Sequence, residues 1–259
     1  MRRFLLIAVV LMTVIGTCWA SKSSPNKPVK IPPQTPQTTG QNILPTHKHT
    51  VNCDDTGAEP VQIICILDRS GSMRSLAEDT IGGYNSFIDK QKKESGKAAV
   101  TTVLFDDQYE KILDNVDLER TPELTSSEYY ARGTTALLDA VGRTIMDTAG
   151  NMEKEGICPA KRRVLVIIMT DGLENASREY NKADVKAMIE ATSNEYKWNY
   201  IFMGANIDSV AEATSMGIRA GNARNYKATP QGVRESFALM ENAATEVREN
   251  GEVSEDWNK

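Results

Sequence analysis

Histidine is almost absent from this chain: the only two are His47 and His49, both in a proline-rich stretch. Everything after them therefore lacks an imidazole for acid–base catalysis and for the usual zinc sites. The sequence also lacks a Gly-x-Ser-x-Gly nucleophile motif and a glycine-rich loop of the phosphate-binding type. These absences argue against a conventional hydrolase, and we expect a protein that is not an enzyme.

Cysteine is sparse, with four residues in 259. Cys18 lies in the N-terminal apolar region, and Cys65 lies inside an apolar run that is typical of a buried strand. Cys53 and Cys158 each precede one of two apolar runs. If those runs are neighbouring parallel strands, both cysteines lie beyond the same edge of the sheet and can pair in an oxidising compartment. The sequence leaves this disulfide open, because connectivity cannot be read from spacing.

Acidic residues are missing from the first fifty positions, so charge is distributed unevenly. Beyond residue 50 the chain has 24 basic and 35 acidic residues, a net charge of −11. Such a charge argues against nucleic acid or an anionic lipid surface as the main partner. It suits a protein that attracts cations.

Long hydrophobic runs are confined to the N-terminus, where Arg2 and Arg3 precede an apolar stretch from Phe4 to Ile15. We interpret residues 1–20 as a signal peptide that is cleaved after Ala20. Two alternatives remain: a lipoprotein-like box that ends in an acylated Cys18, and an uncleaved membrane anchor. Apart from such an anchor or lipid, we expect no membrane contact. We therefore expect an extracytoplasmic location, which means periplasmic, cell-surface or secreted.

The rest of the chain divides into three parts by composition. Residues 21–55 hold six of the ten prolines, and such a segment is typical of an extended linker. Residues 56–250 form the folded domain, and we expect residues 251–259 to be a flexible C-terminal tail. Between 56 and 250 the apolar runs predict strands at Val61–Leu67, Ala98–Phe105, Lys111–Val116, Val164–Thr170 and Asn199–Gly204, with a weak sixth at Ile218–Ala220.

Helical spacing of apolar residues separates these strands. The pattern predicts helices over Met73–Ile88, Leu138–Thr148, Lys182–Tyr196, Ser209–Met216 and Pro230–Val247. Alternating strands and helices indicate an α/β fold with a doubly wound, mostly parallel, Rossmann-like sheet and helices on both faces. The short connection between the second and third strands predicts a hairpin, and therefore one antiparallel edge strand. In such folds ligands bind beyond the carboxyl ends of the strands.

Three segments rich in oxygen ligands follow strand ends or begin helices. They are Asp68-Arg-Ser70-Gly-Ser72, then Arg-Gly-Thr134-Thr135-Ala-Leu-Leu-Asp-Ala, and then Met-Thr-Asp171-Gly. Each alone is an ordinary helix cap or turn. Together they supply two carboxylates and several hydroxyls without sulfur or imidazole, a donor set that favours a hard cation such as Mg²⁺.

In these segments the chain resembles the von Willebrand factor type A (vWA) domain, whose metal-ion-dependent adhesion site (MIDAS) has the pattern Asp-x-Ser-x-Ser, a later Thr and then Asp-Gly. The resemblance implies that Ser70 and Ser72 bind Mg²⁺ directly, with Mn²⁺ or Ca²⁺ as alternatives. It implies that Asp68 and Asp171 bind directly or through water. Aligning the phrase around Thr135 makes this residue, rather than its neighbour Thr134, the threonine ligand. Family members bind an Asp or Glu carboxylate of a protein partner.

Four further residues are candidates for the rim of the site: Thr134, Asp106, Glu174 and Asn206. Their alternative roles are turn and cap chemistry. Two alternative functions accompany the metal-dependent binding module. One is a Mg²⁺-dependent hydrolase that uses the cation as a Lewis acid. The other is a vWA scaffold that binds partners without a metal.

Overall fold

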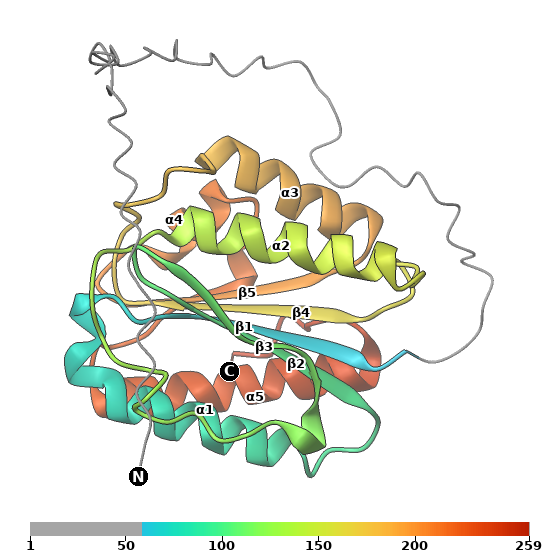
Figure 1. Ribbon diagram of the computed structural model, residues 1–259, viewed down its shortest axis with the longest axis horizontal. Helices are drawn as coiled ribbons and strands as arrows, with labels where there is room; N and C mark the ends of the chain where they lie inside the picture. Colours follow the sequence, from blue (N-terminus) through green and yellow to red (C-terminus); the bar gives the residue numbers. More distant parts are fainter. Residues whose placement is uncertain (1–58, 259) are drawn as a thin grey trace, which may run out of the picture. The chain divides into compact units, whose positions relative to one another are not determined.

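The computed structural model describes residues 59–258, and within them the strands form one six-stranded sheet in the order β3-β2-β1-β4-β5-β6 (Figure 1). All neighbouring strands are parallel except β2 and β3, which form an antiparallel hairpin at the edge. The predicted α/β sheet with one antiparallel edge strand is therefore confirmed. The strands are β1 (Val61–Asp68), β2 (Ala98–Phe105), β3 (Tyr109–Asp117), β4 (Val164–Thr170), β5 (Asn199–Gly204) and β6 (Ala223–Asn225).

The two most apolar strands, β1 and β4, lie side by side in the middle of the sheet. Every residue of both strands is buried, as expected for strands that helices cover on both faces. Their register pairs Leu67 with Met169, so both strands reach the same edge of the sheet. Asp68, the last residue of β1, and Asp171, directly after β4, therefore lie at the same edge of the sheet.

Helices cover the sheet in two layers (Figure 1). On one face, α1 (Ala77–Gln91) and α5 (Pro230–Asn250) pack over a core that includes Phe87 and Phe237. On the other face lie α2 (Leu137–Lys154), α3 (Lys182–Glu195) and α4 (Ser209–Ser215). This arrangement leaves the ends of the strands uncovered by the helical layers.

Local sequence signals explain where the helices begin and end. Thr229 caps α5 by accepting a hydrogen bond from Gly232, and Pro230 occupies the first turn, where its missing N–H costs nothing. The helix ends at Gly251, which has the left-handed conformation. Asn181 caps α3 and exchanges hydrogen bonds with Asp184 in a capping box.

Several element bounds differ from the prediction by a few residues, and two differences go beyond the bounds. The sixth strand is β6 at Ala223–Asn225, whereas we expected Ile218–Ala220. Ile218 is instead a buried core residue directly after the turn that ends α4. Its apolar side chain therefore reflects burial in the core rather than a strand. The first helical region opens with a 3-10 turn at Gly71–Leu76 before α1 begins.

The end of the described chain is packed rather than free, which corrects the expectation of a flexible tail from residue 251. Trp257 is 1% exposed, and its indole N–H donates to the carbonyl of Gly221 at 2.9 Å. Val253 donates its backbone N–H to Asn199 Oδ1 at 3.1 Å. The surrounding residues are polar and gave no periodic signal, but one buried tryptophan removes a large apolar area from water.

Three predictions fall outside the described residues: the signal peptide (1–20), the linker (21–55) and the state of Cys53. Within the described part, Cys158 is disulfide-bonded and Cys65 is a free, buried thiol. The pairing of Cys53 with Cys158 stays a prediction. Between residues 59 and 258, none of the helices has the length and apolar character needed to cross a membrane.

Candidate metal centre

The two aspartates at the carboxyl edge of the sheet are both largely withdrawn from water. Asp68 is completely buried at the end of β1, and Asp171 follows β4 with 4% exposure. Asp68 Oδ1 accepts the backbone N–H of Ser70 at 2.6 Å, and its Oδ2 accepts the hydroxyl of Thr170 at 2.6 Å. The carboxylate is thus held in one orientation from both sides. Thr170 is a residue that sequence reasoning did not single out, although it directly precedes Asp171.

The serine hydroxyls bridge from Asp68 to Asp171. Ser70 Oγ lies 3.1 Å from Ser72 Oγ, and Ser72 Oγ donates to Asp171 Oδ1 at 2.5 Å. This chain of contacts joins two loops that are 99 residues apart in sequence. The four predicted residues therefore form one hydrogen-bonded cluster.

Thr135 reaches the same cluster from a third loop. It is 3% exposed, whereas its neighbour Thr134 is exposed to solvent. A side-chain carbon placed on Gly172 would lie 3.7 Å from Thr135 Oγ1 and 3.9 Å from Ser72 Oγ, so both hydroxyls flank this glycine. Asn175 holds the threonine by accepting its N–H at 2.9 Å and donating to its carbonyl at 3.0 Å. This placement favours Thr135 over Thr134 as the candidate threonine ligand.

Burial disfavours the ionised form of both carboxylates. It raises the pKa of Asp68 from 3.8 to about 6, and hydrogen bonds from Thr170 and Ser70 only partly oppose that rise. Burial also raises the pKa of Asp171 above its ordinary value, against the hydrogen bond from Ser72. A cation among these oxygens would favour the charged forms.

The donor set decides which cation fits. It contains two carboxylates and the hydroxyls of Ser70, Ser72 and Thr135, with no nitrogen or sulfur atom among them. Across residues 59–258 no group of three or more His, Cys, Asp or Glu side chains is placed to hold a metal. Few carboxylates combined with neutral oxygens fit a hard divalent cation that retains water ligands, as Mg²⁺ does.

Asp106, which we expected at the rim, is committed to a buried ion-pair network. Its Oδ2 lies 3.1 Å from Arg69 Nε and 2.6 Å from Arg132 Nε, and its Oδ1 accepts the N–H of Gln108 at 2.7 Å. Arg69 follows Asp68, and Arg132 lies just before the Thr135 loop. Asp106 therefore ties together two of the three segments of the site, and its oxygens already have partners. This corrects its assignment as a cation-facing residue.

Both arginines of this network were missed by sequence reasoning. Arg69 is completely buried, and its guanidinium also lies 2.6 Å from Glu110 Oε2. Arg132 donates its backbone N–H to the carbonyl of Arg69 at 2.9 Å. The available signal was their position, because each arginine lies inside a segment that carries a candidate ligand.

Glu174 and Asn206 also stabilise loops. Glu174 Oε2 accepts the N–H of Leu138 at 2.9 Å in the first turn of α2, and its Oε1 accepts the N–H of Ser177 at 2.7 Å. Asn206 has a positive φ of 57° and donates to the carbonyl of Asp171 at 3.3 Å. Both residues thus position the loops around Asp171 and Thr135. This is the turn and cap role that the sequence left as the alternative.

One glycine and one tyrosine complete the support of the site. Gly133 has a φ of 64°, and a side-chain carbon there would lie 2.0 Å from Asp107 Oδ1, so no larger residue fits without a shift. Gly133 also accepts the N–H of Gly71 at 3.2 Å, which joins the serine loop to the threonine loop. The hydroxyl of Tyr129, a buried residue, donates to the carbonyl of Asp68.

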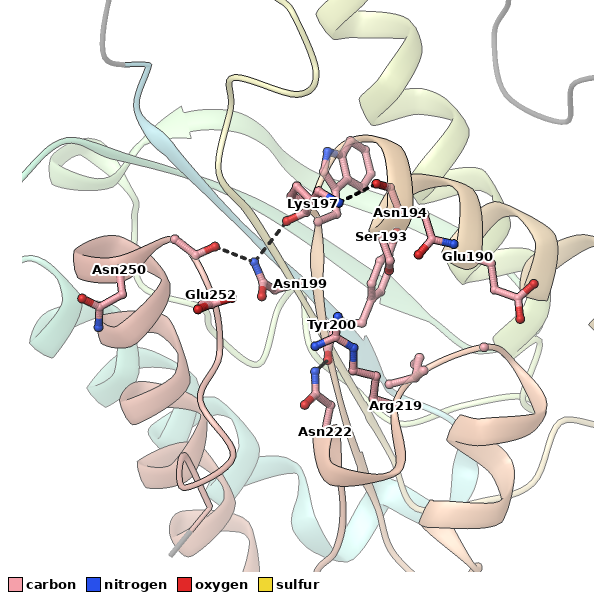
Figure 2. A pocket seen from close by; sticks show the side chains of 14 residues that line it. Glu190, Ser193, Asn194, Lys197, Asn199, Tyr200, Arg219, Asn222, Asn250 and Glu252 are labelled. Carbon is pink, nitrogen blue, oxygen red and sulfur yellow. Dashed lines mark hydrogen bonds between the residues drawn. The ribbon is translucent and has the colours of Figure 1, made fainter.

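A separate cavity of about 580 Å³ lies at the opposite edge of the sheet, where β5 begins (Figure 2). Three of the polar side chains that line it bind backbone carbonyls. Asn199 Nδ2 donates to Gly251 O at 3.0 Å, Asn222 Nδ2 to Tyr200 O at 2.9 Å, and Lys197 Nζ to Asn194 O at 2.8 Å. This cavity gathers none of the candidate cation ligands, all of which lie at the other edge.

The fold and the site together define an open α/β domain with a cluster of oxygen ligands beyond the carboxyl ends of its central strands. No protein-family model matches the chain, and no curated protein matches it. Among solved structures, a von Willebrand factor type A protein from Catenulispora acidiphila is 19% identical over 73% of this chain and 43% of its own, with a TM-score of 0.50.

Two further solved structures are similar. Manganese-loaded TRAP protein from Plasmodium vivax is 18% identical over 70% of this chain and 72% of its own, with a TM-score of 0.50. Proximal thread matrix protein 1 from the mussel byssus, with a zinc-occupied MIDAS motif, is 13% identical over 72% of this chain and 48% of its own, with a TM-score of 0.50. This chain thus spans less than half the length of the bacterial and mussel proteins. It has the fold of a von Willebrand factor type A domain.

Proposed function

We propose that this protein binds Mg²⁺ at the carboxyl edge of the sheet and uses the cation to bind a protein partner. Ser70, Ser72 and Thr135 contribute hydroxyl oxygens, while Asp68 and Asp171 bind the cation directly or through water. The observation that carries this proposal is the contact chain from Ser70 through Ser72 to Asp171, which gathers oxygen donors from separate loops. The raised pKa values of the two aspartates support it, because buried carboxylates gain from a nearby cation.

The partner's contribution follows from the charge of the ligands. Three of the five ligands are neutral hydroxyls, and the remaining positions of an octahedral Mg²⁺ are filled by exchangeable water. A carboxylate from outside can replace such a water, and its negative charge neutralises part of the charge of the cation. An Asp or Glu side chain of a partner protein supplies that group. The similar structures described as manganese-loaded and as having a zinc-occupied MIDAS motif support a divalent cation at such a site, and Mn²⁺ or Ca²⁺ are alternatives here.

The proposed setting is outside the cytoplasm. The N-terminal charge and apolar pattern support export through a signal peptide, with an acylated Cys18 as the alternative form. The disulfide at Cys158 supports an oxidising compartment. A proline-rich linker would then hold the domain away from a membrane or wall. Mass spectrometry of the mature protein from its native host tests this part, because an N-terminus at Met1 contradicts cleavage.

Thermal unfolding in the presence of Mg²⁺ tests the cation site. At a hundredfold excess over Kd, binding stabilises the folded state by about 2.7 kcal/mol, which raises Tm by about 5–10 °C for a domain of this size. Asp171→Ala should abolish this shift. Asp89→Ala, which changes an exposed aspartate on α1, should keep it. If the wild-type protein shows no shift with Mg²⁺, Mn²⁺ or Ca²⁺, the domain is a scaffold that works without metal.

A further inference from the structure

Large hydrophobic side chains are exposed at three positions within residues 59–258: Tyr130 (45%), Leu173 (59%) and Val210 (40%). All three belong to segments at the carboxyl edge of the sheet. Tyr130 lies on the segment that leads to Thr135, Leu173 follows Asp171 by two residues, and Val210 lies in the first turn of α4, after β5 ends. Exposed apolar groups that gather in one place mark interaction sites, whereas scattered single ones are ordinary.

Tyr130 is fixed in place despite its exposure. Its ring lies under two guanidinium groups, with Arg132 Cζ 5.1 Å and Arg69 Cζ 5.5 Å from the ring centroid. Its hydroxyl accepts a hydrogen bond from Arg132 Nη1 at 2.9 Å. Arg69 directly precedes Ser70 and Arg132 lies three residues before Thr135, so side chains from two of the segments that carry candidate ligands hold the ring. A rigid, partly exposed aromatic ring loses little entropy on binding, which is why such residues anchor interfaces.

Leu173 comes after the last candidate ligand in the sequence, Asp171, whereas Tyr130 comes before Thr135. The loop that carries Leu173 is held at both flanks: Gly172 donates its N–H to Thr170 Oγ1 at 3.2 Å, and Asn175 donates to the carbonyl of Thr135 at 3.0 Å. The leucine therefore projects from an anchored loop and is more than half exposed. In the free protein this exposure is unfavourable, because the apolar surface is in contact with water.

We propose that these side chains contact the residues next to the partner's carboxylate. The preferred ligand is then an Asp or Glu that is flanked by large apolar side chains in an extended segment. This inference rests on the proposed function, which places the carboxylate on the cation. The net charge of the protein distinguishes this ligand from one that is rich in acidic residues. The chain beyond residue 50 has a net charge of −11, so a run of acidic residues is repelled, whereas one acid among apolar neighbours is not.

Selection from random peptides displayed on phage tests this preference. The full-length protein is immobilised in Mg²⁺, and bound phage are eluted with EDTA so that only cation-dependent binders are recovered. We expect an Asp or Glu with leucine-sized or aromatic residues on either side. In synthetic versions of the recovered peptides, changing one flanking apolar residue to serine should weaken binding by about tenfold, as expected for loss of one buried leucine-sized contact.

Variants of the protein distinguish the preference for apolar neighbours from the metal-dependent binding of the carboxylate. Leu173→Ser and Tyr130→Ser should still recover the acid but lose the apolar neighbours, while the Mg²⁺-induced Tm shift stays unchanged. Ala238→Ser, at an exposed position of α5, is the control and should recover the wild-type peptides. Acidic peptides without apolar neighbours, or apolar neighbours that persist in both variants, overturn this inference alone. A complete lack of EDTA-eluted acidic peptides overturns the metal-dependent binding function itself.

Discussion

The two edges of the sheet differ in what their polar side chains bind. At the carboxyl edge, side chains from distant loops bind one another, as Ser72 does with Asp171 and Asp106 with two arginines. At the amino edge, where the larger cavity lies, the asparagines bind backbone carbonyls and hold turns together (Figure 2). The buried carboxylates with raised pKa values lie at the carboxyl edge, which is the edge where we propose the cation site.

The largest expected effect concerns the ion pairs that organise the carboxyl edge. Asp106→Ala removes the buried carboxylate that Arg69 and Arg132 share and leaves Arg69 with Glu110 as its remaining acidic partner. Breaking a buried pair in this way costs about 3–5 kcal/mol of unfolding free energy. Asp107→Ala changes the exposed neighbour and should cost less than about 0.5 kcal/mol. Urea denaturation of both variants measures the difference. Equal losses would show that the network adds nothing to the stability of this edge.

Two adjacent threonines should differ in their effect on cation binding, because Thr135 is buried and Thr134 is exposed. Thr135→Ala removes a buried hydroxyl at the cluster and should weaken Mg²⁺ binding by about 10–100-fold. Thr134→Ala removes an exposed hydroxyl and should change the affinity by less than about threefold. Isothermal titration of the two variants with Mg²⁺ compares them directly. A stronger effect at Thr134 would reverse the assignment.

Without a cation, the stability of the carboxyl edge should depend on pH. The pKa of Asp68 is raised from 3.8 to about 6 in the folded protein, so the folded state binds more protons than the unfolded state between these values. The free energy of unfolding should therefore fall as pH rises from about 4 to about 6, by about 2 kcal/mol. Urea titrations in EDTA measure the slope. Asp68→Asn should flatten it, and a wild-type slope equal to that of the variant would contradict the prediction.

The smallest expected effect is at the amino edge. Asn199→Ala removes side-chain hydrogen bonds to Gly251 and Val253, which should lower the unfolding free energy by about 1–2 kcal/mol. Its Mg²⁺-induced Tm shift should equal that of the wild-type protein, because the residue lies at the start of β5, at the other end of the strand from the cluster. A reduced shift would show that the two edges are coupled.

Much of the fold was predictable because its strongest signals are local. The apolar runs gave the bounds of β2, β4 and β5, since a strand buried on both faces is mostly apolar along its length. The cap pair Thr229-Pro230 placed the start of α5. The sixth strand was misplaced because β6 has three residues, and its pairing with β5 decides its position more than its own sequence does.

The clustering of the candidate ligands was predictable from the sequence, but the residues that hold them in place were not. The motifs singled out Asp68, Ser70, Ser72 and Asp171, and their side chains meet in one cluster. The same reasoning placed Asp106 at the rim, whereas it is paired with Arg69 in the interior. A carboxylate after a strand has the same sequence signal whether it faces a cation or an arginine. Only the partner's position distinguishes the two.

The sequence by itself determined the order of strands and helices, the edge at which polar ligands gather and the chemical type of those ligands, because hydrophobic periodicity and strand-end motifs are properties of short segments. Tertiary structure alone decided which oxygens are free and which are committed. It also decided that Trp257 packs onto the domain and that Tyr130 and Leu173 are exposed beside the cluster. These outcomes depend on contacts between residues far apart in the chain, and no local pattern encodes the distance between them.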